Sequence, residues 1–189
     1  MSVFLRRFID NKKYIVISIS IVLLMGIVFG IYQYHHSTNM IKHFFENLFY
    51  LNVESYENHY QIYLFQNIFF IIVCTYMSSS YLGHIGILFL LFLKGMQISF
   101  SILYTFSIVY FSFTIMILII IEIILELLLC IVLGIYHIHL SIYVTLITFY
   151  IEQNFNIKSM LNYRLNCIIV SLIIFVLSLA FRIYIIPLF

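Results

Sequence analysis

Three ionisable residues, Lys94, Glu122 and Glu126, lie deep within apolar stretches of the chain. A charge at the centre of a bilayer costs about 2.5–3.5 kcal/mol on insertion scales, so each of these side chains should face protein or water. Glu122 and Glu126 are four residues apart and therefore share one face of a helix. If the chain turns near Tyr110, Lys94 and Glu126 are equally far from that turn, about 24 Å along each helix. The spacing predicts an intramembrane ion pair between Lys94 and Glu126, with Glu122 one turn nearer the outside.

Two interpretations of these three residues are open. The first is a structural clamp between two helices. The second is a proton or cation pathway, in which a small transporter or channel subunit uses Lys94, Glu122 and Glu126. The clamp is favoured, because transporter sites typically use broken helices or an Asp/His relay, and the sequence here indicates only one Lys and two Glu.

The remaining residue types predict no catalytic centre, cofactor or metal site. The chain contains no G-x-S-x-G nucleophile motif, no Walker A loop and no H-E-x-x-H. Its three cysteines are odd in number and widely spaced, and its seven histidines follow no fixed ligand spacing. We therefore expect a non-enzymatic protein.

Small residues recur four apart in two of the apolar stretches. Gly26 and Gly30 form a G-x-x-x-G sequence, and Gly95 with Ser99 repeats the same spacing. Such ridges let helix backbones approach closely, so the pattern predicts helix packing at both places. The residues leave open whether each ridge meets a helix of this chain or a partner.

The composition indicates the class of protein that these residues belong to. Of 189 residues, 65% are hydrophobic and 8% are charged, whereas a soluble domain has about 45–50% apolar and about 25% charged residues. A net charge of +2 gives no electrostatic footprint for nucleic acid. The chain is therefore predicted to be a multi-pass membrane protein solvated by the lipid bilayer.

The predicted fold is all-α, a single-domain bundle of about five membrane-spanning helices. At about 20 residues per crossing, the spans are expected at 14–34, 62–81, 84–107, 112–134 and 167–187. The fourth span is expected to run to about Gly134. Residues 135–150 are short for a crossing and contain His137 and His139. They either extend the fourth span, form an interfacial helix or add a sixth span.

The basic residues predict the orientation of these helices. Arg6, Arg7, Lys12 and Lys13 precede the first span and should hold the N-terminus in the cytoplasm. The loop at 37–61 then faces outward, and its apolar clusters favour a short amphipathic helix on the membrane surface.

Two short strings resemble the stage II sporulation protein M family. They are Met25-Gly26-Ile27-Val28-Phe29-Gly30 in the first span and Leu91-Phe92-Leu93-Lys94-Gly95 in the third. The family has an M-G-x-x-F-G-like sequence in its first helix and an L-F-L-K-G-like sequence later, followed by small and aromatic residues as at Ser99, Phe100 and Ser101. The chain length, the basic N-terminus, the single outer loop and the number of spans are also similar.

The resemblance implies a role in endospore formation. It implies a scaffold in the cell membrane at the sporulation septum, which holds two peptidoglycan-degrading partners, stage II sporulation proteins P and D, during septal thinning and engulfment. Under this hypothesis the outer loop and the Gly26/Gly30 face are the expected contact surfaces. The loop residues expected to contact the partners are Phe44, Phe45, Glu46, Glu54 and Glu57.

Overall fold

A computed structural model of the chain describes residues 12–40, 42, 56–108, 113–149 and 157–184. Within these ranges all regular secondary structure is α-helical, so the predicted all-α fold class is confirmed there. The five long helices are α2 (Lys12–His36), α4 (Tyr56–Met77), α5 (Gly83–Ile108), α6 (Phe113–Thr148) and α7 (Ile157–Tyr184).

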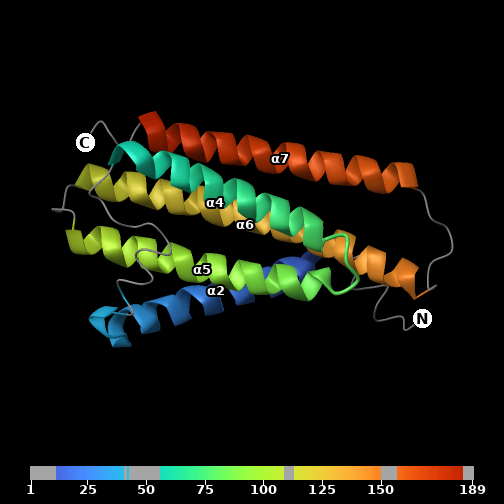
Figure 1. Ribbon diagram of the computed structural model, residues 1–189, viewed down its shortest axis with the longest axis horizontal. Coiled ribbons are helices and arrows are strands. Elements are labelled where there is room, and N and C mark those ends of the chain that lie inside the picture. Colours follow the sequence, from blue (N-terminus) through green and yellow to red (C-terminus); the bar gives the residue numbers. More distant parts are fainter. Residues whose placement is uncertain (1–11, 41, 43–55, 109–112, 150–156, 185–189) are drawn as a thin grey trace.

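The helices form an elongated bundle in which successive helices run in opposite directions (Figure 1). Helix α6 contacts each of the other four, and α2 packs mainly along α5. The apolar core lies where these helices meet. It includes Ile19 of α2, Leu91 of α5 and Leu133 of α6, all with no exposed surface.

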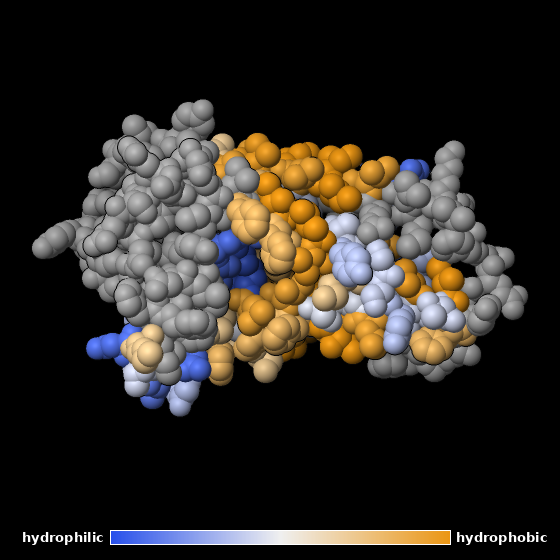
Figure 2. Space-filling model, viewed as in Figure 1, coloured by the Kyte–Doolittle hydropathy of each residue, from blue (hydrophilic) through white to orange (hydrophobic). Residues whose placement is uncertain are grey.

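Within the described ranges, three helices are long and apolar enough to cross a membrane. Their apolar segments are Lys13–His36, Gly83–Phe100 and Ile123–Thr148, and α4 and α7 carry the shorter apolar stretches Phe65–Met77 and Ile168–Leu177. Only 28% of the most apolar window of α2 is buried within the bundle. Large apolar side chains thus cover the outside, and Figure 2 shows a predominantly hydrophobic band over the coloured part of the surface. Such a surface suits lipid rather than water.

The turn between α4 and α5 ends the second predicted span earlier than the sequence indicated. The span was expected to reach residue 81, but α4 ends at Met77. The Ser78 hydroxyl donates to the carbonyl oxygen of Thr75 at 2.7 Å, a local bond of the kind that competes with further helix. Gly83 starts α5 so close to the Met77 carbonyl oxygen that a Cβ would not fit there.

Helix α6 continues past Gly134, which agrees with the alternative that residues after Gly134 extend the fourth span. The helix has 36 residues, and Gly134 is buried where a Cβ would lie 2.8 Å from Ile19 Cδ1. Glycine is thus a close-packing residue here rather than a helix breaker. Residues 135–148 extend α6 and form no separate sixth helix.

The extension of α6 is attached to the α4–α5 turn by two hydrogen bonds. Ser141 Oγ donates to the Ser80 carbonyl oxygen at 2.9 Å, and Thr145 Oγ1 donates to the Tyr81 carbonyl oxygen at 2.6 Å.

The last predicted span also differs from the structure, since α7 begins at Ile157, ten residues before the expected start at residue 167.

Candidate functional site

Lys94 and Glu126 lie opposite each other on α5 and α6, as their equal distances from the predicted turn indicated. Lys94 Nζ is 3.8 Å from Glu126 Oε1, and the two side chains are 4% and 13% exposed. This separation is longer than the ~2.7–2.9 Å of a charge-assisted hydrogen bond, so the contact is an ion pair. Glu122 belongs to α6, but its side chain lies outside the described residues.

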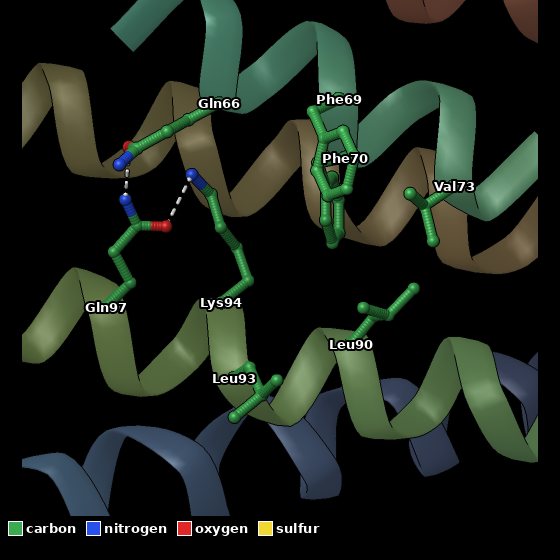
Figure 3. A pocket seen from close by; sticks show the side chains of 8 residues that line it. All are labelled: Gln66, Phe69, Phe70, Val73, Leu90, Leu93, Lys94 and Gln97. Atoms are coloured by element: carbon green, nitrogen blue, oxygen red, sulfur yellow. Dashed lines mark hydrogen bonds between the residues drawn. The ribbon is translucent and has the colours of Figure 1, made fainter. Parts of the chain in front are cut away.

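Two glutamines extend the ion pair into a polar cluster. Lys94 Nζ donates to Gln97 Oε1 at 3.1 Å, and Gln97 Nε2 donates to Gln66 Oε1 of α4 at 2.8 Å (Figure 3). The polar cluster of Lys94, Glu126, Gln97 and Gln66 thus links α4, α5 and α6. Lys94 lies near the middle of α5, where lipid supplies no compensating hydrogen bonds.

The two glutamines were not among the predicted site residues, although a signal for one of them was present in the sequence. Gln97 follows Lys94 by three residues and so shares its helix face. Gln66 lies beside Asn67 within a predicted span, and only the packing of α4 against α5 brings Gln66 to Gln97.

A hollow of about 210 Å³ opens beside the polar cluster, between α4 and α5. Figure 3 shows the polar groups at one end and apolar side chains at the other. Figure 2 shows a recessed hydrophilic patch at the edge of the hydrophobic band. The residues lining the hollow are Gln66, Phe69, Phe70, Val73, Leu90, Leu93, Lys94 and Gln97.

The small residues of α2 and α5 meet in one helix crossing. A Cβ added at Gly26 would collide with the Phe92 carbonyl oxygen, and one added at Gly30 would collide with Ser99 Oγ. From the other side, a Cβ at Gly95 would lie 2.6 Å from the Leu23 carbonyl oxygen. Both predicted ridges therefore pack against each other within the chain, with the backbones in direct contact.

This crossing corrects the expected partner-contact surface and brings together the two strings that resemble the family. The Gly26/Gly30 face was expected as a contact surface for a partner, but both glycines are buried against α5 and cannot meet another protein. The crossing also joins the two strings that carry the family resemblance, 25–30 and 91–95. They are distant in sequence and form a single packing unit.

Most of the expected partner-contact residues lie outside the described part of the chain. They are Phe44, Phe45, Glu46 and Glu54. Glu57 belongs to the first turn of α4, so the outer loop is shorter than the predicted 37–61, and the side chain of Glu57 is not among those described.

Over the described residues, no group of three His, Cys, Asp or Glu side chains could hold a metal ion. Cys74 and Cys130 are both buried, and they lie on different helices. The polar cluster at mid-depth is therefore the candidate site that the described side chains offer.

The chain matches no model of a known protein family, and searches of curated proteins and of solved structures find no match either. The resemblance to the stage II sporulation protein M family stays a prediction, and it depends on the two strings that meet at the α2–α5 crossing.

Proposed function

We propose that this chain is a non-enzymatic membrane scaffold of endospore engulfment, which anchors septal peptidoglycan-degrading partners. The observation that carries the proposal is the α2–α5 crossing. The residues on which the family resemblance depends, 25–30 and 91–95, contact each other there through their backbones. A motif that serves to lock two helices together suits a protein whose task is to hold a fixed shape.

The polar cluster supports the same proposal. The ammonium group of Lys94 is directed to Glu126 and Gln97 inside the protein. Its charge is therefore used to join helices, which a rigid scaffold requires. A scaffold acts by tethering its partners at high effective concentration, and this effect needs no chemistry of its own.

The proposed partners are stage II sporulation proteins P and D, on the outer side of the membrane at the sporulation septum. The proposed orientation has the N-terminus in the cytoplasm, from its basic residues. The segment 37–55 that links α2 to α4 would then face the septal wall.

The proposal is tested by deleting the gene in the native host and imaging the membrane with a fluorescent dye. We expect arrest with a flat septum that is not thinned, and recovery when the wild-type gene is restored. Complementation with Gly26→Leu should fail, whereas Met25→Leu should succeed because Met25 is 60% exposed beside the crossing. Normal engulfment in the deletion strain, or a host that forms no endospores, would refute the proposal.

A second experiment tests the tethering step directly. The outer segment 43–55 is replaced by a Gly/Ser linker of equal length, and the amidase-like partner is co-purified with each form. The replacement should abolish recovery of the partner while the membrane level of the scaffold stays the same. Unchanged recovery would exclude this segment as the contact surface.

The polar hollow favours a second candidate, a small transporter or channel subunit that uses Lys94, Glu122 and Glu126. Its basis is the row of polar groups at mid-depth beside an opening of about 210 Å³. Neutralising Glu122 or Glu126 as Gln should abolish ion or solute flux in vesicles if the chain is a transporter. Engulfment that proceeds normally with either folded variant would favour the scaffold instead.

A further inference from the structure

The Gln66 carboxamide ends the polar cluster with an amino group that meets no acceptor among the described residues. Gln66 Oε1 accepts from Gln97, whose own carbonyl oxygen accepts from Lys94. Among the described residues this is the only hydrogen bond of Gln66, and its amino group is not fully buried. Because hydrocarbon offers no acceptor, an open amino group near the middle of a membrane helix is costly. The Gln66 amino group therefore requires an acceptor from outside the described part of the chain.

The size of the hollow indicates what kind of group supplies that acceptor. Small-molecule sites usually measure about 300–1,000 Å³, whereas this hollow measures about 210 Å³. It suits one or two side chains of a neighbouring helix better than a free ligand. Lys94 is already paired with Glu126 and is 5% exposed, so the hollow offers no free cation for an anionic headgroup.

An apolar ridge on α4 borders the hollow and faces outward. Its members follow the 4-3-4 spacing of a helix-packing seam and are Phe65, Phe69, Ile72 and Tyr76. Each is more than half exposed, and the rings of Phe65 and Phe69 stack with their centroids 6.2 Å apart. Phe69 belongs both to this ridge and to the lining of the hollow. A helix packed on the ridge would thus reach the Gln66 amino group.

We propose that the α4 ridge and the hollow form a homodimer interface, in which Gln66 of one copy pairs with Gln66 of a second copy. A carboxamide is self-complementary, since it carries both donors and an acceptor with a second lone pair. All copies have the same orientation in a membrane, so a two-fold axis along the membrane normal brings the same residue of each copy to the same depth. A different partner would need its own acceptor at that depth.

The first test is disulfide cross-linking in native membranes. In a background with all three cysteines replaced by Ala, Ile72→Cys places a thiol on the ridge, and Leu24→Cys is the matched control on α2. The two positions are 59% and 60% exposed. Oxidation with copper phenanthroline should convert Ile72→Cys to a covalent dimer of this chain and leave Leu24→Cys monomeric. Equal cross-linking of both, absence of a dimer, or a covalent adduct of Ile72→Cys with a different protein would overturn the proposal.

The second test measures dimer dissociation by energy transfer between labelled copies in lipid vesicles. An interhelical hydrogen bond in a membrane contributes about 0.6–2 kcal/mol, so Gln66→Leu should raise the dissociation constant about 3- to 30-fold. Gln33→Leu, the same substitution on α2, should leave it unchanged. Helix content by circular dichroism shows whether each variant is folded. A folded Gln66→Leu with the wild-type constant would refute the pairing, and the cross-linking test keeps Gln66 intact if this variant does not fold.

Discussion

Replacing Gly95 by alanine should loosen the α2–α5 crossing and destabilise the bundle. The added Cβ would lie 2.6 Å from the Leu23 carbonyl oxygen, which is a backbone atom and cannot turn aside. Restoring an ordinary contact requires the helices to separate by about 0.8 Å, and a gap of that size forfeits about a quarter to a half of the dispersion energy of each contact that opens. Gly86→Ala on the same helix is the control, because its Cβ would meet only the flexible Met77 side chain, at 3.1 Å from Sδ.

The membrane makes the expected magnitude easier to estimate. In water, Gly→Ala would also raise helix propensity by about 0.8–1 kcal/mol, but in a bilayer the separated helices stay helical, so this gain cancels. The packing loss remains, and we expect Gly95→Ala to weaken the association of α2 with α5 by about 1–3 kcal/mol. Gly86→Ala should stay within about 0.5 kcal/mol of the wild type.

The assay is heating in detergent micelles with a maleimide dye that fluoresces on reaction with thiols. With Cys167 replaced by Ala, the remaining thiols of Cys74 and Cys130 are both buried, so their labelling reports opening of the bundle. Gly95→Ala should label at a lower temperature than the wild type, and Gly86→Ala at the same temperature. Equal shifts for the two variants, or none for Gly95→Ala, would refute the close backbone contact as the source of stability.

Two further predictions concern the polar contacts between helices. Lys94→Met or Glu126→Leu alone should lower the folded yield in membranes, because removing one partner of a buried pair costs about 3–5 kcal/mol. The double variant and the charge swap should both recover much of the yield, and a swap no better than the single variants would exclude the pairing. Ser141→Ala and Thr145→Val should each lower the free energy of unfolding by about 0.5–1.5 kcal/mol in the same thiol assay, since each removes a hydrogen bond to the α4–α5 turn. Thr148→Val is their control, since the Thr148 hydroxyl bonds only to its own helix at Val144, and a shift of equal size there would contradict the assignment.

The polar cluster illustrates how far sequence reasoning reaches in this protein. Lys94 and Glu126 could be paired in advance, because helix rise converts residue number into depth and the cost of a buried charge demands a partner. Gln66 could not be added to them by the same argument. Its depth matches, but depth leaves open which helices are neighbours and which faces they turn to each other.

A glycine can either interrupt a helix or allow a close contact between helices, and the sequence does not distinguish these two roles. The fourth span was placed up to Gly134 with an extension beyond it left open, and Gly134 lies inside α6, where Ile19 packs too closely for a side chain. The sequence left it open whether Gly26 contacts a partner protein or another helix of this chain, and in the structure Gly26 packs on α5. A residue without a side chain permits both a break and a close approach, and the neighbouring helix decides between them.

Composition and hydropathy by themselves determined that the chain is helical and apolar enough for a membrane, because backbone groups in lipid must be satisfied within each segment. Helix rise further determined which buried charges share a depth. The tertiary structure alone decided that α6 continues to Thr148, that the two glycine ridges face each other and that Gln66 completes the polar cluster. The physical reason is that lipid and apolar side chains solvate a helix equally well on every side, so the arrangement of helices depends on close packing and on a few polar contacts between segments distant in sequence.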